Sequence, residues 1–311
     1  MSILINGSSG FVGRALSCYL ERAGIGYSAI CRSVYDGSKN PECLSFAMNL
    51  CVDEPRSIVY LAHTFTMGDR IESSIDEYKR NIDNASKTLQ IASINDVKKI
   101  IYVSSGGTVY GEALCLPIDE EHPTNPKSTY GRSKLFVEEY LKNECERLGI
   151  ILIILRPGNI FGPGHTRKNQ GIINVAIEKL LADDVIEIYG DGESVRDYLY
   201  VDDLVSALVK AIFSPHQGSG VFNVASEIGV SIRDVVGAVS GVLGVNTPKV
   251  LYRDSRKIDI RNNVLSAKRF RALFDWQTNF DLITGIRRTV DSRMQTEAVL
   301  SSRLDGEFSG P

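Results

Sequence analysis

Short apolar runs alternate along the chain with stretches whose apolar residues recur at helical spacing. Residues 2–5 (SILI) are such a run, and a glycine-rich turn joins them to residues 11–24, where the apolar positions follow a helical period. A long helical pattern follows at residues 75–96. Further runs predict strands at residues 26–32, 57–63 and 98–105. Because consecutive parallel strands need a covering crossover, the alternation predicts an α/β fold: a Rossmann-type doubly wound parallel sheet.

The second half of the chain predicts a change of architecture. Residues 128–149 follow a helical pattern that ends at a glycine, and the apolar run opening residues 150–164 is typical of a buried parallel strand. Shorter, mixed elements come next, so we expect a smaller mixed α/β substrate domain, partly interleaved with the first. The predicted parts are a dinucleotide-binding domain over residues 1–164, the substrate domain over 165–296, and a polar tail, expected to fray, over 297–311.

Composition narrows the class of protein. The 311 residues are 43% hydrophobic and 23% charged with a net charge of −3, which gives no global reason to expect nucleic acid or an anionic membrane as partner. No apolar segment approaches the roughly 20 residues that span a bilayer, and the first residues lack the features of a secretory signal, so a cytoplasmic location is expected. Six cysteines without a C-x-x-C pair and four scattered histidines predict no metal. The expected partner is a small molecule.

The turn after the first predicted strand, GSSGFVG, carries three spaced glycines. The first permits a tight turn, the second lets the backbone approach a pyrophosphate, and the third lets the helix lie close to the sheet. An ordinary strand-to-helix turn is the alternative, but the position at the first junction of an alternating chain favours dinucleotide binding. The cofactor-binding residues predicted here are Gly7, Gly10, Phe11, Val12 and Gly13.

The end of the second predicted strand, AICRS, bears on the choice of cofactor. An acid there would bind the ribose 2′-hydroxyl of NAD, whereas Cys31 is no acid and Arg32 could pair with the 2′-phosphate of NADP. A solvated Arg32 stacked on the adenine is the alternative. The sequence therefore favours NADP(H) over NAD(H).

The segment YGRSK places Tyr130 and Lys134 four residues apart at the start of a predicted helix. Residues at this spacing share one face, and an ammonium beside a phenol lowers the phenol's pKa. The pair could therefore act as an acid and base near neutral pH. A surface pair with no role is the alternative.

With these motifs the chain resembles the extended short-chain dehydrogenase/reductase family, and within it the nucleotide-sugar epimerases, dehydratases and 4-keto reductases. The resemblance covers the chain from about residue 2 to about residue 290. It rests on the ordered motifs GSSGFVG, VYLAH, YKRN, YVSSGGTVYG, STYGRSK, LRPGNIFGPG, YGDGESVRDYLYVDDL and FNVAS. Each motif alone is weak, but the ordered set is specific.

The resemblance implies roles for individual residues. Tyr130 resembles the catalytic acid/base, and Lys134 the residue that holds the nicotinamide ribose and tunes that tyrosine. Asn159 matches a contact to the substrate diphosphate, Arg196 matches the arginine that clamps it, and Arg256 resembles a second such arginine. Further implied cofactor contacts are Asn49, Leu61, Ala62, Asn81 and Ser104. A structural ion pair between Arg196 and its neighbour Asp197 is an alternative that could hold at the same time.

The strand end YVSSGGTVYG departs from the family pattern. The family's epimerases have a catalytic hydroxyl four residues before the tyrosine that ends this motif, which here is Tyr110. This chain has Gly106 at that position, so the role of the hydroxyl passes to Ser105, to Thr108, to a water, or is vacant. The family's 4,6-dehydratases continue with an Asp-Glu pair that moves protons during elimination. Here Gly107 and Thr108 stand in those places, which excludes elimination of that kind.

Two reactions and one binding role are compatible with these motifs, and the sequence favours the first, a reduction, over the others. The missing acid at Cys31 favours NADPH-dependent reduction of the C4 ketone of a nucleoside-diphosphate 4-keto-6-deoxyhexose, with dTDP the first nucleotide to consider and Tyr130 as proton donor. The retained TVYG favours a UDP-hexose 4-epimerase with tightly bound NAD. Gly106 alone suggests a non-catalytic NADP-binding sensor. The resemblance further implies a homodimer joined through the helices at residues 71–95 and 129–148.

Overall fold

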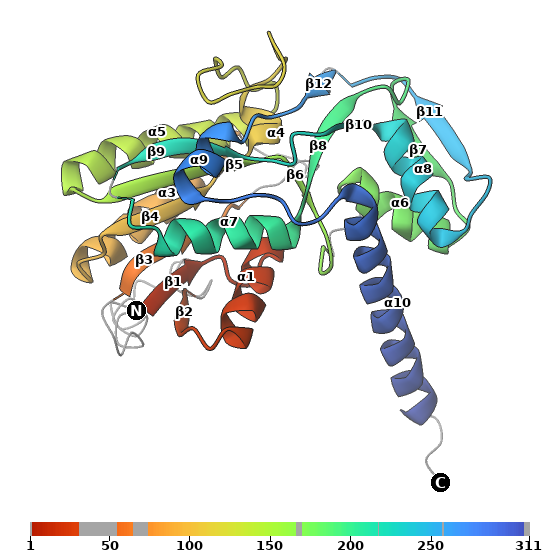
Figure 1. Cartoon of the computed structure of the whole chain (residues 1–311), viewed down its shortest axis with the longest axis horizontal. Helices are drawn as coiled ribbons and strands as arrows, with labels where there is room; N and C mark the ends of the chain where they lie inside the picture. Colours follow the sequence, from red (N-terminus) through yellow and green to blue (C-terminus); the bar gives the residue numbers. More distant parts are fainter. Residues whose placement is uncertain are drawn as a thin grey trace.

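The computed structural model describes residues 2–30, 55–64, 74–165, 170–216, 218–256 and 258–307. Figure 1 shows a large sheet between two layers of helices and, beside it, a smaller part built from short strands and helices. A long final helix extends away from the smaller part toward the C-terminus.

The large sheet has six strands in the order β2-β1-β3-β4-β5-β9, and every neighbouring pair is parallel. Its strands are β1 (Ser2–Asn6), β2 (Tyr27–Ile30), β3 (Pro55–Tyr60), β4 (Lys99–Val103), β5 (Ile151–Pro157) and β9 (Gly220–Val224). The predicted doubly wound parallel sheet is confirmed.

Both faces of this sheet are buried, because alternate residues of each strand enter two separate cores. Ile3 and Ile5 of β1 enter one core, and Leu4 between them enters the other. The helices on the two faces are α1 (Phe11–Arg22) and α7 (Val201–Phe213) on one, and α3 (Ser74–Ile94) and α5 (Thr129–Leu148) on the other (Figure 1). Continuous apolar strands are therefore what this sheet requires.

The smaller part is organised around β8 (Val195–Tyr200). This strand pairs in parallel with β6 (Asn159–Phe161) and β12 (Asn262–Asn263), and antiparallel with β10 (Gly229–Ser231). The other elements are β7 (Ile186–Tyr189), β11 (Val250–Arg253), α6 (Ile172–Leu181), α8 (Ile232–Leu243) and α10 (Leu282–Glu307). Since β9 returns to the large sheet between β8 and β10, the chain crosses between the parts more than once, and the boundary near residue 164 stays a prediction.

In the structure α10 continues through residues 297–307, and the division of the chain into a polar tail from residue 297 stays a prediction. Among the helices of the described ranges, none is long and apolar enough to cross a bilayer.

The strand order reverses beside β1, and this reversal locates a binding crevice. The chain runs from β1 to β2 on one side and then to β3 on the other side of β1. In open α/β sheets, ligands bind at the carboxyl ends of the strands where the order reverses. The turn after β1 and the loop after β3 meet there, since both Leu61 and Ala62 donate their backbone N–H to the carbonyl of Asn6.

Candidate functional site

The glycines of the first turn lie where side chains would collide with backbone. Gly7 has φ +97°, and a Cβ on it would lie 2.7 Å from the nitrogen of Ala62. A Cβ on Gly13 would lie 2.1 Å from the carbonyl oxygen of Gly7. Gly10 precedes α1 and supplies no side-chain cap, so the first N–H groups of that helix are open to an anion. The turn fits a dinucleotide pyrophosphate.

Two neighbours of these glycines have other contacts. The ring of Phe11 stacks on His165 with centroids 4.9 Å apart, and Val12 packs against the core. Arg14 donates to the carbonyl of Gly164 at 2.6 Å. The turn is thereby joined to the loop after β6, and the cofactor contacts of Phe11 and Val12 stay predictions.

Tyr130 and Lys134 lie together at the carboxyl end of β4. Ser128 caps α5 by accepting the N–H of Gly131 at 3.0 Å, and the helix starts at Thr129, one residue before Tyr130. Lys134 donates to the carbonyl of Val103 at 2.9 Å, and its ammonium lies 5.8 Å from the centroid of the Tyr130 ring. Burial lowers the pKa of Lys134 to about 7, against the opposing effect of the nearby Glu138. With a pKa of about 7, Lys134 can release or accept a proton near neutral pH.

Sequence reasoning missed His63, which contacts the catalytic candidate directly. Its ring meets the ring of Tyr130 edge to face at 5.2 Å, and its Nε2 lies 3.9 Å from a carboxylate oxygen of Glu77. Burial, and then the charge of Lys134, hold the pKa of His63 well below its usual value, so this imidazole is neutral. The only signal in the sequence was a histidine at the end of the strand predicted over residues 57–63.

Asn81 acts on the site through the loop that follows β3. Its side-chain oxygen accepts the N–H of Thr64 at 3.0 Å, and its amide nitrogen donates to Ser133 of α5 at 3.1 Å. Asn81 is fully buried. The predicted contact to the cofactor is untested, but the structure shows that Asn81 holds the loop of Leu61 and Ala62 against α5.

The burial of Lys134 predicts a stability that depends on pH. The unfolded lysine binds its proton up to a pKa near 10.5, whereas the folded one releases it near pH 7, so the unfolded state binds more protons between these values. Stability should therefore rise with pH across that window. Lys134→Met removes the free-energy cost of burying the ammonium. It should therefore raise the melting temperature by about 5 °C at pH 6.5 and hardly at pH 10. Differential scanning fluorimetry at several pH values measures this.

Lys142, on the same helix with a side chain that is 38% exposed, supplies the control. Lys142→Met should shift the melting temperature little at any pH. A lower melting temperature for Lys134→Met at pH 6.5 would contradict the assignment of a destabilising buried ammonium.

The strand end after β4 presents three hydroxyls in different states. Ser104 Oγ is buried and has no hydrogen-bond partner among the described residues, as fits a polar group of a bound cofactor. Ser105 precedes the short helix α4 (Gly106–Val109), is half-buried, and makes no capping bond with its side chain. Thr108 is buried, and its Oγ1 donates to the carbonyl of Ser105 at 3.4 Å. Of the two candidates for the missing hydroxyl, Thr108 is thus already engaged.

The glycine at position 106 has a packing reason. A Cβ there would lie 2.5 Å from Cδ1 of Leu265 and 2.8 Å from the carbonyl oxygen of Arg156. A side chain would enter the contact between the end of β5 and Leu265, so serine does not fit here without displacement. The packing of Leu265 and the Arg156 carbonyl thus leaves room only for glycine at this position, and the role of the missing hydroxyl stays a prediction.

Gly106→Ser should consequently destabilise the protein without improving catalysis. Forcing a side chain into a packed contact costs about 1–3 kcal/mol, so we expect a melting temperature lower by about 5 °C and no gain in turnover. Gly237→Ser in α8 is the matched control, because nothing lies within 4 Å of a Cβ at Gly237. A faster Gly106→Ser enzyme of normal stability would show that the hydroxyl fits.

Arg196 of β8 presents a positive charge in the smaller part. Its Nη1 donates to its neighbour's carbonyl, that of Val195, at 2.9 Å, and among the described residues it forms no ion pair with a carboxylate. Burial lowers its pKa from the usual value, but a guanidinium stays charged at neutral pH. Four nearby arginines do have carboxylate partners: Arg233, Arg253, Arg256 and Arg261. A half-buried guanidinium without a carboxylate is suited to an anionic ligand.

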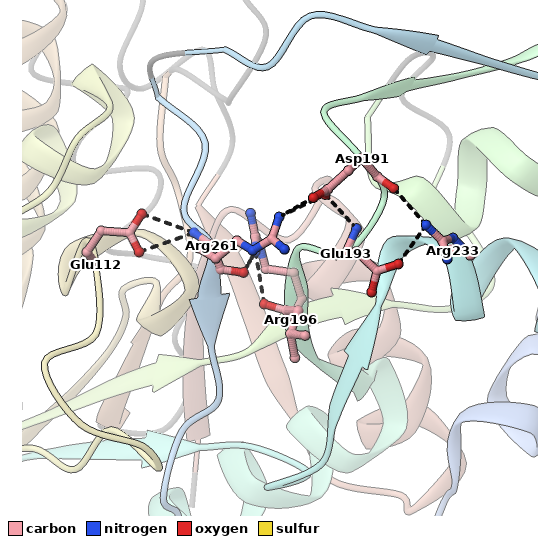
Figure 2. Close-up of polar contacts among 7 residues, drawn as sticks. Glu112, Asp191, Glu193, Arg196, Arg233 and Arg261 are labelled. Carbon is pink, nitrogen blue, oxygen red and sulfur yellow. Dashed lines mark hydrogen bonds and ion pairs between the residues drawn. The ribbon is translucent and has the colours of Figure 1, made fainter.

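Figure 2 shows the surroundings of Arg196. Arg261 pairs with both carboxylate oxygens of Asp191 at 2.8 Å, and Arg233 pairs with Glu193 at 2.6 Å. Glu112 reaches the same cluster from the segment that follows α4. The strand end that carries Ser105 and the strand that carries Arg196 therefore border one region.

The alternative ion pair between Arg196 and Asp197 is wrong. Consecutive strand residues point to opposite faces, and the Asp197 carboxylate accepts instead the N–H groups of Ser226 and Glu227, each at 2.9 Å. Asp197 is buried, and desolvation raises its pKa to about 6. It fastens the loop after β9 to β8, so Arg196 has no carboxylate partner among the residues that the structure describes.

The other two predicted substrate residues differ in their surroundings. Asn159 of β6 pairs in register with Tyr198. A Cβ on Gly107 would lie 2.5 Å from the side-chain oxygen of Asn159. Asn159 therefore lies against the strand end near Tyr130. Arg256 is already paired with Asp259 at 3.0 Å and lies 4.3 Å from the centroid of the Tyr189 ring.

Two predicted cofactor contacts, Arg32 and Asn49, lie outside the described residues. In the described part of the chain, no group of three or more histidine, cysteine or acidic side chains is arranged to hold a metal.

The Rossmann-type fold, the glycine turn and the Tyr130–Lys134 pair define an enzyme that uses a nicotinamide dinucleotide. The chain belongs to the NAD dependent epimerase/dehydratase family, whose model matches residues 3–225. Enzymes of this kind act on nucleotide sugars.

Individual relatives carry two different activities. The UDP-glucose 4-epimerase of Mycolicibacterium smegmatis is 28% identical over 310 residues, covering 94% of this chain and 98% of its own. The dTDP-4-dehydro-6-deoxyglucose reductase of Escherichia coli is 31% identical over 227 residues, covering 70% of each chain. The structure of the Thermotoga maritima UDP-glucose 4-epimerase with UDP-glucose superposes with a TM-score of 0.84 at 26% identity, covering 95% of this chain and 99% of the other.

Proposed function

We propose that this protein transfers hydride at C4 of a nucleoside-diphosphate hexose and works as a 4-epimerase. The observation that carries the proposal is the placement of two groups around one region: the Tyr130–Lys134 pair at the end of β4, and the charged, carboxylate-free Arg196 on β8. The first suits the chemistry of a sugar hydroxyl, and the second suits a diphosphate.

The chain's own residues divide the work. Arg196, with Asn159, binds the diphosphate and orients the sugar. Tyr130 takes the proton of the C4 hydroxyl and later returns it, while Lys134 beside it stabilises the negative charge. Ser105 is the hydroxyl that bonds the sugar oxygen, because its side chain makes no capping bond and Thr108 is engaged with a carbonyl. The buried His63 ring keeps water from one side of Tyr130.

The residues present fit a nicotinamide dinucleotide. Gly7, Gly10 and Gly13 leave a turn without side chains, and the unpartnered Ser104 Oγ can bond the amide of a nicotinamide. When bound, this group supplies the acceptor and donor of the hydride. Arg32 supports NADP(H), which the reductase would use, whereas the 4-epimerase is associated with tightly bound NAD.

The choice between epimerase and reductase rests on separate observations. The relative that matches nearly the whole chain has the 4-epimerase activity, which supports the epimerase. The Arg32 of AICRS and the shorter match to a 4-keto reductase support reduction of a dTDP-linked 4-keto-6-deoxyhexose, the second candidate. The non-catalytic sensor was suggested by Gly106 alone, and the Tyr130–Lys134 pair together with Arg196 supports a catalytic role over it.

One pair of assays separates the candidates. The purified protein is incubated with UDP-galactose without added cofactor, and the products are resolved by chromatography. The 4-epimerase produces UDP-glucose. If no epimer forms, and instead NADPH is oxidised when dTDP-4-keto-6-deoxyglucose is supplied, the reductase is correct. Inactivity in both assays contradicts the proposed reaction.

We also propose that the protein is a homodimer that pairs α3 and α5 with their counterparts in a second copy. Outward-facing apolar side chains support this: Ile75 is 62% and Phe136 54% exposed, and Tyr78 of α3 lies 5.9 Å, between ring centroids, from Phe136 of α5. Sedimentation analysis should give twice the chain mass for the wild type and the single mass for Phe136→Lys.

A further inference from the structure

The segment of residues 259–266, here called the strap, runs between the smaller part and the catalytic strand end. Lys127 donates to the carbonyl of Asp259 at 3.2 Å, and both carboxylate oxygens of Glu112 accept the N–H of Arg261, at 3.0 and 3.2 Å. Glu112 and Lys127 also pair with each other at 2.7 Å. The start of the strap is therefore held by Glu112, which directly follows YVSSGGTVYG in the sequence, and by Lys127, which directly precedes STYGRSK.

The middle of the strap contacts the catalytic strand end itself. Asn263 is 1% exposed and donates from its side chain to the carbonyl of Gly106 at 3.1 Å. Leu265 fills the space that a side chain at Gly106 would need. A shift of the strap would therefore displace the residues beside Ser105.

The other edge of the strap supports Arg196. Asn262 pairs with Val195 and Asn263 with Arg196 in the β8–β12 ladder, and the carbonyl of Arg261 accepts the N–H of Val195 at 2.9 Å. The Arg196 guanidinium lies over the same point, since its Nη1 is 3.5 Å from the Arg261 carbonyl (Figure 2). Because β12 has only two residues, the ladder alone restrains the strap weakly, and the contacts outside it fix its position.

The charge of Glu112 also acts on Arg196. The Glu112 carboxylate raises the pKa of Arg196, as does that of Asp259. Taken alone, a negative charge at this place opposes the binding of an anion to Arg196. Glu112 is therefore unfavourable for anion binding by charge, and any favourable effect it has must come from geometry.

We propose that Glu112 is a positioning residue, which fastens the strap from the cofactor side of the molecule and so holds Arg196 where the diphosphate of the nucleotide sugar binds. The inference rests on the proposed function. The strap links the catalytic strand end to Arg196, so that the sugar reaches Tyr130 when the diphosphate is bound.

A role of Glu112 through its charge and a role through positioning predict opposite changes in UDP affinity, so the test distinguishes them. If Glu112 acted only by its charge, Glu112→Ala would tighten the binding of UDP. If it positions Arg196, Glu112→Ala should weaken UDP about tenfold, because small misplacements of binding groups have effects of this size. Glu112→Gln removes the charge but keeps an acceptor for the Arg261 N–H, so its UDP affinity should be within about twofold of wild type, or tighter.

The measurement is calorimetric titration of the full-length protein with UDP. Glu112→Ala should weaken UDP in the wild-type background and have no further effect beside Arg196→Ala, and steady-state assays should show a raised KM with kcat nearly unchanged. Glu193→Gln is the control, since the Glu193 carboxylate pairs with Arg233 at the same rim and, among the described residues, forms no hydrogen bond or ion pair with the strap. Melting temperatures verify that each variant is folded.

Three results would overturn the inference: unchanged or tighter UDP binding by Glu112→Ala, equal losses in Glu112→Gln and Glu112→Ala, or losses that add in the double variant. A failure of the proposed function looks different, because then Arg196→Ala itself leaves UDP binding unchanged.

Discussion

Tyr130→Phe is expected to lower kcat about a thousandfold while UDP and nicotinamide cofactor bind with nearly wild-type affinity. Proton transfer by a positioned side chain contributes a factor of about 10² to 10⁴, and phenylalanine keeps the ring that packs against His63. Only the hydroxyl is lost, so the fold, the ring contact and the position of Lys134 should persist. Steady-state kinetics, with calorimetric titrations of UDP and cofactor, measure the two sides of this expectation.

The matched control is Tyr140→Phe, at a position ten residues further along the same helix α5. It should leave kcat and both affinities unchanged. A Tyr130→Phe enzyme with more than about a tenth of the wild-type kcat would exclude Tyr130 as the acid/base.

Arg196→Ala is expected to weaken UDP about a hundredfold and to leave the stability of the ligand-free protein unchanged or slightly higher. Two charge-assisted hydrogen bonds to a diphosphate contribute about 3 kcal/mol together, which corresponds to about two orders of magnitude in affinity. Stability should not fall, since the half-buried guanidinium has no carboxylate partner among the described residues to leave behind. Titration with UDP and thermal unfolding measure the two effects.

Arg253→Ala serves as the comparison, because Arg253 is an arginine of the same part that pairs with Glu187 at 2.6 Å and is half-exposed. Its removal should change UDP affinity little. Loss of stability in Arg196→Ala, with UDP affinity retained, would assign Arg196 a structural role instead.

Local patterns predicted the cofactor side of the site well. The glycine turn depends on contacts within a few residues and on one neighbouring loop, and the spacing of Tyr130 and Lys134 places them together on any helix. The parallel sheet followed from apolar runs that bury both faces. The substrate side came from the resemblance alone, since nothing local distinguishes Arg196 from its paired neighbours.

What the sequence could not predict depends on contacts between distant residues. Gly106 was interpreted from its absent hydroxyl alone, and nothing in the sequence indicated that Leu265 of the strap packs against this position. Asp197 was a candidate partner of Arg196 until the strand placed the two on opposite faces. His63 carried no motif, and its role depends on α3 and α5 closing around it.

The central claim, hydride transfer at C4 of a nucleotide sugar, is tested most directly with UDP-galactose carrying deuterium at C4. The account predicts slower turnover than with the unlabelled sugar, and deuterium retained at C4 of the UDP-glucose formed. Epimerised product that has exchanged its C4 deuterium for solvent hydrogen would contradict it, because the hydrogen would then have left as a proton.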